Sequence, residues 1–416
     1  MGKASLILVL GYSALLLMSG LLMSDMSVQA YDNAMTYYDQ ESARNIAITG
    51  ANMAANYIFL YPPLINGNAW FNGYTTPVQF NGGSFVVTVD STTSIDPLTG
   101  DKRLTLRSVA TYRDSTATVI AILRPSNFAK FAMYAGSAGS SVYWATYDSI
   151  FGPTHVEGTL RTTGYPYFGG KATCKNNVDS TSWSGHPIFN AGVETGVSIP
   201  LNRDYTKLRE KAAAGGKSFT GNDDLYLHFK GDSITYKRAP AGPDTTVLAT
   251  ALAPNGAIVL NNSNGKLHVK GIVKGRFTIG AIDTQSTSRG QVVIDDHIRY
   301  NTDPRVNPAS TDMLGIVANQ KITIADNNAS GGGPNFTVMA ALFSYAASIE
   351  VENLATRNLG TLYTYGGWTV NDIYATTNSS ITKGLKVNLR FDERFRTSAP
   401  PYFPTTKAYE ILAWYE

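Results

Sequence analysis

The side chains that could carry acid–base or metal chemistry are few in this sequence. It contains five histidines, with neither a His-Glu-x-x-His motif nor two histidines at i, i+4 spacing. His155 and Glu157 stand two residues apart, so on a strand both side chains would project to one face. This spacing could make an acid–base pair or half of a metal site. The structural alternative is a histidine at the end of a turn that accepts a backbone hydrogen bond.

Acidic residues suggest two places for calcium. Asp90, Asp96 and Asp101 lie in "DSTTSIDPLTGD", a loop whose carboxylates could hold calcium with help from backbone carbonyls. The loop lacks the dense Asp-x-Asp-x-Asp-Gly pattern, so we expect no metal and no cofactor, with calcium at this loop as the one exception. Asp295 and Asp296 precede a histidine in "IDDHIRY", where a β-solenoid polysaccharide lyase could place calcium-binding acids. A polar corner between coils is the structural alternative.

Catalytic motifs of the common kinds are missing from the sequence. It has no Gly-x-Ser-x-Gly, no Walker A motif, and no Gly-x-Gly-x-x-Gly in a strand–helix setting. Cys174 is the single cysteine, which excludes an intrachain disulfide, and we expect it to be a small buried apolar residue. The sequence therefore predicts no catalytic residues and a non-enzymatic protein.

Composition limits the partners of the 416-residue chain. Its net charge is +3 and it has no run of lysine or arginine, so nucleic-acid binding has no electrostatic footprint. Charged residues make up only 16% of the chain, below the usual quarter. Glycine, serine, threonine, asparagine and tyrosine take their place, a mixture typical of extracellular β-rich proteins.

The first element that must position these residues is an apolar N-terminal segment. Residues 4–23 carry no charge and would make roughly 30 Å of helix, the thickness of a bilayer's hydrocarbon core. A secretory signal usually has a shorter apolar region, of about 7–15 residues. However, the small residues before Tyr31 resemble a cleavage site, so a signal peptide cut after Ala30 remains the alternative. The apolar side chains expected to drive assembly are Leu6, Ile7, Leu8, Val9, Leu10, Leu15, Leu16, Leu17, Leu21 and Leu22.

Helical periodicity continues through residues 31–60, the expected amphipathic part of one helical segment over residues 1–62. The chain has no proline until Pro62, so one helix from about residue 3 to about residue 60 would be roughly 85 Å long. Alanines beside the apolar stripe would permit close packing. The expected stripe consists of Met35, Tyr38, Ser42, Ile46, Gly50, Met53, Tyr57 and Leu60.

From about residue 68 the apolar period changes to two. Residues 68–150 predict a twisted antiparallel sheet that covers the C-terminal half of the helix. Short β-rich triplets at spacings of about 15–25 residues follow in 151–416, which favours a parallel β-solenoid with a β-sandwich as the alternative. An insertion is expected near 202–246, and the chain end should pack on the last coil with Trp414 and Tyr415 buried. The fold class is thus α+β, mainly β.

Aromatic residues suggest how the surface is used. The chain has 24 tyrosines and 5 tryptophans, many beside glycine, serine or threonine. The segments "TLYTYGGWTVNDIY" and "TGYPYFGG" could line a subunit contact or stack on sugars, or their rings could cap the ends of the solenoid.

A basic residue, an uncharged helix and the alanine-rich run "ARNIAITGANMAANYIF" together resemble the N-termini of type IV pilin-like proteins. The likeness is greatest to minor pilins and to the pseudopilins of type II secretion. The rest of the chain is similar to an uncharacterised domain family of bacterial surface proteins. The segments that carry this second likeness are "FAKFAMYAGSAGSSVYWATYDSIFGPTHVEGTL", "GYPYFGGKAT", "GQVVIDDHIRYNTDP", "DMLGIVANQKITI" and "PPYFPTTKAYEILAWYE".

The resemblance implies a subunit held in the inner membrane and then polymerised, with copies of itself or other pilin-like subunits packed through their helices. The sequence departs from the family pattern in two places: its only leader candidate ends at Gly2, and the usual glutamate is missing, with Ser5 in its place if Met1 is the mature start. Typical pilins carry a glutamate at the fifth place after a Gly-ended leader, whereas here Ile7 is fifth after Gly2. The residues therefore do not support the usual leader processing.

We accordingly expect a structural subunit of an extracellular, type IV pilus-like or pseudopilus-like filament, assembled through its apolar helix. Lys3 should stay cytoplasmic before assembly, with residues beyond Asp25 outside the membrane. An ordinary single-span anchor that displays the β-rich part would look similar. The functional alternative is a membrane-tethered or secreted β-solenoid that binds or cleaves polysaccharide, and adhesion to glycan surfaces is compatible with either role.

Overall fold

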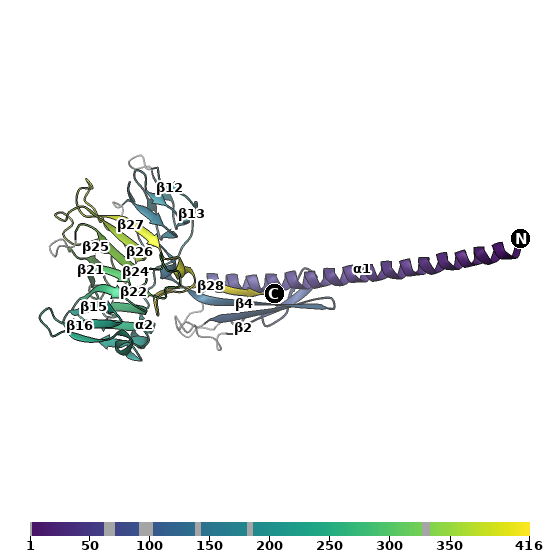
Figure 1. The fold of residues 1–416 in the computed structure, drawn as a ribbon, viewed down its shortest axis with the longest axis horizontal. Coiled ribbons are helices and arrows are strands. Elements are labelled where there is room, and N and C mark those ends of the chain that lie inside the picture. The colour runs from purple at the N-terminus through teal and green to yellow at the C-terminus, as the bar shows by residue number, and fades with distance from the viewer. Residues whose placement is uncertain (1, 62–70, 91–102, 138–142, 181–185, 327–332) are drawn as a thin grey trace. The chain divides into compact units, whose positions relative to one another are not determined.

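The computed structural model describes residues 2–61, 71–90, 103–137, 143–180, 186–326 and 333–416. These residues form two compact units. The helix unit contains the described residues up to 125 together with 408–416, and the β body contains those from 126 to 407. A long N-terminal helix and a chain otherwise dominated by strands confirm the expected α+β, mainly β class (Figure 1).

Helix α1 (Gly2–Leu60) is one unbroken element of 59 residues, as the sequence predicts. At about 1.5 Å per residue it is roughly 89 Å long. Its interior contains no proline, and the bond from Tyr61 N to Tyr57 O closes its last turn. Local sequence alone therefore accounts for the length of this element.

The sheet of the helix unit lies along the C-terminal half of α1 (Figure 1). Neighbouring strands β1 to β4 pair antiparallel, with Phe85 opposite Ala110 and Leu106 opposite Ala121. Strands β3 and β4 form a hairpin whose turn is at Asp114. The pairing of β1 to β4 confirms the expected antiparallel sheet. The strand order is β1 (Val78–Phe80), β2 (Gly83–Asp90), β3 (Leu104–Tyr112), β4 (Ser115–Asn127) and β28 (Thr405–Tyr415).

The face that α1 buries against this sheet is made mainly of alanines, and the predicted stripe is largely wrong. Of that stripe only Ile46 and Gly50 are buried, whereas Tyr38 and Leu60 are more than half exposed. The reason is the closeness of the sheet, because a Cβ atom on Gly50 would stand only 2.6 Å from Ser108 Oγ. At the position of Gly50 there is no space for a larger side chain. The buried residues are Ala43, Ile46, Ala47, Gly50, Ala51, Ala54 and Ile58.

The last strand of the chain, β28, belongs to the helix unit, although the expected range 151–416 placed it with the β-rich part. It neighbours β4, and Arg124 Nε donates to Glu410 Oε1 at 2.9 Å. Tyr415 is more than half exposed at the chain end, so the expectation that it is buried on a last coil is wrong. Pairing with a strand nearly three hundred residues away, rather than the local sequence, sets the place of this segment.

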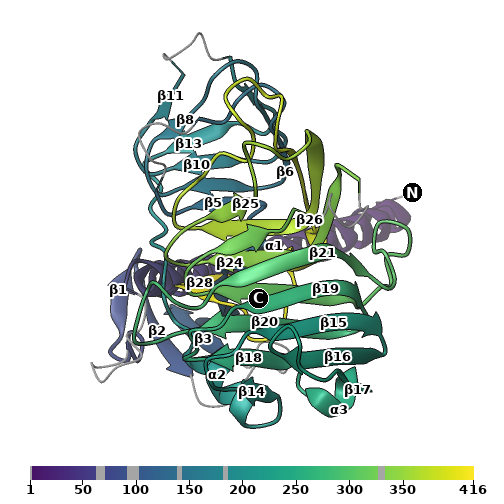
Figure 2. The ribbon, with the colours of Figure 1, turned by 90° about the vertical axis from the view of Figure 1, so that its left-hand side faces the viewer.

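The β body is built on parallel ladders (Figure 2). In the longest, each strand pairs parallel with the next, from β14 at the bottom of the view to β13 near the top. This ladder contains β14 (Lys217–Phe219), β18 (Ala257–Asn261), β20 (Arg276–Ile282), β22 (Met313–Ala318), β24 (Phe336–Ser344), β26 (Gly360–Val370), β5 (Met133–Ala135), β7 (Thr154–Val156), β10 (Ala172–Cys174) and β13 (Val193–Thr195).

Further parallel ladders flank the longest one, and a hairpin projects from it. One contains β15 (Leu225–Gly231), β19 (Leu267–Val273), β21 (Val292–Tyr300), β23 (Ile322–Ile324) and β25 (Ile349–Val351). Another contains β27 (Leu385–Phe391), β6 (Ser149–Phe151), β9 (Tyr167–Phe168) and β12 (Ile188–Phe189), and β8 (Leu160–Arg161) pairs with β11 (Val178–Asp179). Strand β16 (Ser233–Arg238) pairs antiparallel with β15 and with β17 (Thr245–Leu248), beside the short helix α3 (Ala249–Leu252).

The order of strands in the longest ladder differs from their order in the chain. Strand β5 lies in the middle of the ladder, between β26 and β7, although it comes first in the β body. The chain runs outward from β5 to β13 and then returns to the opposite end at β14. We call residues 197–213 the return segment; it ends in helix α2 (Thr206–Ala213), as the helical spacing after Tyr205 predicts.

The return segment is bonded to strands along the ladder. Ile199 O accepts a hydrogen bond from Tyr134 Oη at 2.5 Å. Arg203 donates to Asp283 O at 2.6 Å and to Asn319 Oδ1 at 3.1 Å. These contacts join parts of the β body that are far apart in sequence, so the segment holds the two halves of the ladder in one unit.

Candidate functional site

The candidate assembly site is the N-terminal part of α1, where every described residue up to Ala34 is exposed. The apolar side chains surround the helix axis instead of forming a stripe, a pattern typical of a helix that is buried on all sides by lipid or by other helices. Leu16 is 60% exposed and Leu17 is 70% exposed, and the other eight apolar residues expected to drive assembly are each more than half exposed. Within the part of the chain that the structure describes, α1 is the one helix long and apolar enough to cross a membrane.

Among the described residues, polar contacts from α1 to the rest of the helix unit lie where the helix reaches its sheet. Arg113 Nη1 donates to Asp39 Oδ1 at 3.1 Å, and Arg44 Nε donates to Glu416 Oε2 at 2.9 Å. Both pairs lie near the start of the buried alanine face. The helix therefore has two parts. The apolar part does not contact the described strands of the sheet, and the docked part is held against the sheet by packing and ion pairs.

Similarity between this chain and known proteins is weak at the level of sequence. No family model matches the sequence, and no curated protein matches it. The competence-associated pilin ComZ from Thermus thermophilus is similar at 13% sequence identity, over 91% of this chain and 97% of that chain, with a TM-score of 0.34. The helix unit itself has an exposed apolar helix whose second half docks on an antiparallel sheet.

The structure places His155 and Glu157 together, as their spacing predicts. His155 Nε2 lies 3.1 Å from Glu157 Oε2, and His155 Nδ1 lies 2.8 Å from Thr173 Oγ1. The imidazole is buried and stacks on the ring of Tyr134 at 5.3 Å between centroids. Burial lowers the pKa of His155 despite the neighbouring carboxylate, so the neutral ring donates from Nε2 to Glu157. The expected backbone hydrogen bond at a turn is replaced by side-chain partners.

Glu157 holds the start of the return segment. It accepts hydrogen bonds from Ser198 Oγ at 2.5 Å, from Ile199 N at 2.6 Å, and from Lys175 Nζ at 2.9 Å. Burial alone would raise the pKa of Glu157, but these donors and His155 outweigh it and lower the pKa to about 2. Both carboxylate oxygens are occupied, so the arrangement is a structural anchor instead of an acid–base pair with an open position.

Acid should loosen this anchor. The folded-state pKa of Glu157 lies below the ordinary 4.5, so its contribution is present above pH 4.5 and is lost as the pH falls through about 2. We expect about 2–3 kcal/mol of unfolding free energy to disappear across that window. Glu157→Gln should remove this part of the pH dependence, and Ser198→Ala should shift it to higher pH. Denaturant unfolding at a series of pH values tests this, and identical profiles for Glu157→Gln and the parent chain would refute it.

The other predicted sites are not assembled into metal centres where the structure describes them. Asp295 Oδ1 bonds His268 Nδ1 at 2.7 Å, whereas Asp296 accepts from the backbone of His297 and His297 Nδ1 accepts from Thr337 N. The triplet therefore serves different partners, and no group of three or more His, Cys, Asp or Glu side chains in the described ranges is placed to hold a metal.

Two other expectations concern the possible calcium loop at Asp90, Asp96 and Asp101 and the single cysteine, Cys174. Asp90 ends strand β2, but Asp96 and Asp101 lie outside the described residues, so calcium at that loop stays a prediction. Cys174 is buried on β10, and burial raises the pKa of its thiol, which disfavours the reactive thiolate.

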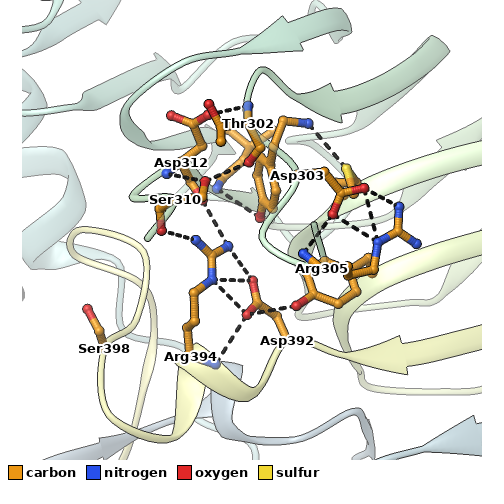
Figure 3. Close-up of polar contacts among 12 residues, drawn as sticks. Thr302, Asp303, Arg305, Ser310, Asp312, Asp392, Arg394 and Ser398 are labelled. Carbon is orange, nitrogen blue, oxygen red and sulfur yellow. Dashed lines mark hydrogen bonds and ion pairs between the residues drawn. The ribbon is translucent and has the colours of Figure 1, made fainter. Parts of the chain in front are cut away.

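A polar network around Asp392 in the β body was not predicted (Figure 3). Asp392 is fully buried and accepts from Arg394 Nε at 2.9 Å and from Nη2 at 2.6 Å. Arg394 also donates from Nη1 to Ser310 O at 2.8 Å and from Nη2 to Asp312 O at 2.9 Å. The pair thus joins the turn that includes the short helix η3 (Glu393–Arg396) to a loop some eighty residues earlier in the chain.

Asp312 extends the network to two further backbone segments. Its carboxylate accepts from Gly275 N at 2.7 Å and from Thr302 N at 2.8 Å, while Ser310 Oγ donates to Thr302 O at 2.6 Å. These partners are backbone groups and one arginine, so the network fixes loops in place. No sequence motif indicates this network, because its residues come together only through the pairing of strands in the β body.

Proposed function

We propose that this chain is a structural subunit of an extracellular pilin-like filament, assembled through the apolar part of α1. The observation that carries the proposal is the exposure of residues 4–23 on all sides of the helix. Burying one leucine or isoleucine side chain is worth about 1.5–3 kcal/mol, so ten of them strongly disfavour a helix left in water. Lipid satisfies this surface before assembly, and helices of other copies or of related pilin-like subunits satisfy it within a filament.

The same helix supports an orientation in the membrane. Lys3 lies at one end of the uncharged segment and Asp25 at the other, about 33 Å apart along the axis. Positive charge favours the cytoplasmic side, so the β body lies outside the inner membrane and reaches the cell surface with the filament. No nucleic acid enters this function.

For the β body we propose a β-solenoid that the filament displays, in a structural and non-enzymatic role. The parallel ladders support this, because the chain alternates between two of them. Strands β18, β20 and β22 lie in one ladder and β19, β21 and β23 in the other, so each successive coil contributes one strand to each. The return segment connects the two ends of the stack. A sandwich, by contrast, would be expected to show mainly antiparallel pairing.

Cross-linking along the helix tests the assembly proposal. The one native cysteine, Cys174, is buried, so single cysteines introduced at each position from Leu6 to Leu22 can be read without background. In a sheared cell-surface fraction, a maleimide cross-linker should give dimers with a three- to four-residue periodicity. Ile411→Cys, exposed on β28, is the matched control outside the helix.

The main alternative is a membrane-tethered or secreted β body that binds or cleaves polysaccharide. The aromatic cavity described below is the observation that favours its binding form. The cross-linking scan separates the two, because a tether would yield no periodic dimers and a secreted protein would begin at Tyr31 after cleavage. Either result would overturn the filament proposal.

A further inference from the structure

The β body contains a cavity of about 530 Å³ whose floor is apolar. Buried side chains from several strands form this floor: Met133 on β5, Ile150 on β6, Trp368 on β26 and Leu389 on β27, with Trp144 beside them. A cavity of this size lies within the range of about 300–1,000 Å³ that is usual for small-molecule sites.

Two loops form the walls of the cavity, and each places a tyrosine at the rim. Tyr147 belongs to the loop 143–148 and is 63% exposed, while Tyr374 belongs to the loop 373–381 and is 41% exposed. Tyr147 has φ of +80°, a strained conformation for a bulky residue, and Lys386 Nζ lies 4.8 Å from its ring centroid.

One carboxylate, that of Asp148, lies in the wall. Its Oδ2 accepts a hydrogen bond from Ala145 N at 2.8 Å, which leaves acceptor capacity on the cavity side. Hydroxyl side chains also line the cavity, whereas the amide of Asn378 is already bonded within its own turn. The hydroxyl-bearing residues that line the cavity, apart from the tyrosines, are Thr146, Thr163, Thr376, Thr377 and Ser379.

These features restrict the occupant by elimination. An apolar ligand would bury the Asp148 carboxylate without donors, which costs free energy. A cationic ligand would face the Lys386 ammonium, and an anionic ligand would face Asp148. What fits is a neutral molecule with one flat C–H face for the aromatic rings and hydroxyl groups for the carboxylate and threonines.

We propose that this cavity binds a neutral saccharide, with one sugar ring stacked on Tyr147 or Tyr374 and its hydroxyls donating to Asp148. The site unites the segment "YWATYDSI" with "TLYTYGGWTVNDIY", the aromatic stretch that the sequence offers for sugar stacking. The inference is independent of filament assembly, since every residue that carries it lies within the β body.

Binding to defined sugars tests the proposal on the full-length chain in detergent. The probes are maltose, cellobiose, lactose and N,N′-diacetylchitobiose at millimolar concentration, followed by saturation-transfer NMR and titration calorimetry. Tyr374→Ala and Asp148→Asn should each weaken binding of the recognised sugar at least tenfold. Asp148→Asn keeps the acceptor for Ala145 N, so its fold is preserved. Tyr363→Ala removes a ring that is 44% exposed elsewhere on β26 and should leave binding unchanged.

The pH dependence gives a second readout. Burial raises the pKa of Asp148 to about 6, partly offset by the hydrogen bond from Ala145. Affinity should therefore fall as the pH drops through about 6, and Asp148→Asn should be insensitive over that range. The ionisable groups that face Asp148 across the described cavity wall are Lys386 and the hydroxyls of Tyr143, Tyr147 and Tyr374.

Three results would overturn the saccharide site. The first is no binding of any of the four sugars by the unmodified chain. The second is an equal loss in Tyr363→Ala, which would mean nonspecific contact with exposed rings. The third is binding of a neutral apolar dye such as N-phenyl-1-naphthylamine in the cavity with no sugar binding, which would assign the cavity to an apolar ligand.

Discussion

Replacing Leu16 with lysine is expected to prevent stable membrane insertion of α1 and, with it, filament formation. Leu16 lies near the centre of the uncharged segment and is exposed in the isolated subunit. On insertion scales, exchanging leucine for lysine at a helix centre costs about 3–4 kcal/mol, and the double variant with Leu17→Lys costs about twice that. A buried ammonium would meet the same penalty among packed helices.

The measurement is the amount of full-length chain in alkali-washed membranes and in the sheared surface fraction. Gln40→Lys is the matched control, because it adds the same charge to an exposed position of the same helix beyond the apolar segment. Filaments at parental levels from Leu16→Lys would contradict the role assigned to the helix. N-terminal sequencing of the unmodified protein completes the experiment, since a lysine in a cleaved signal would also impair export and only a retained helix begins before Tyr31.

Removing the buried carboxylate of Asp392 is expected to cost the β body about 3–5 kcal/mol of unfolding free energy. Asp392→Ala leaves the Arg394 guanidinium mostly buried without its bidentate partner, although its bonds to Ser310 O and Asp312 O remain. Asp392→Asn keeps the shape of the side chain but not its charge. Its unfolding free energy should lie between those of the parent chain and Asp392→Ala.

The adjacent residue supplies the control. Glu393 is exposed and pairs with Arg396 at the surface, so Glu393→Ala should change the unfolding free energy by less than about 1 kcal/mol. Denaturant unfolding of the full-length variants in detergent, followed by circular dichroism, gives both values. If Asp392→Ala unfolds at the same denaturant concentration as Glu393→Ala, the network of Figure 3 has no stabilising role.

Local pattern predicted the elements of the helix unit well but not the face that docks. Both the large apolar stripe and the alanines recur at helical spacing, so periodicity alone could not choose between them. The choice came from the sheet, because a side chain on Gly50 would collide with Ser108 and Phe85. Met53 and Tyr57 are too large for that separation and stay partly exposed.

The candidate sites show the same limit. Two-residue spacing correctly predicted contact between His155 and Glu157, because neighbours on one face of a strand must meet. It could not show that Ser198 and Ile199 occupy the remaining acceptor positions, since the return segment comes from forty residues away. The aromatic cavity likewise needs loops near 145 and 375, which no local pattern connects.

By itself, the sequence determined a long uninterrupted helix, an apolar first part that cannot remain in water, and a mainly β remainder. These depend on backbone propensity, proline placement and side-chain polarity, which act over a few residues. Only the tertiary structure decided that β5 pairs with β26, that the last strand joins β4, and that alanines form the docked face. Those outcomes depend on which segments, distant in sequence, approach one another and how closely. The order of residues along the chain does not determine this.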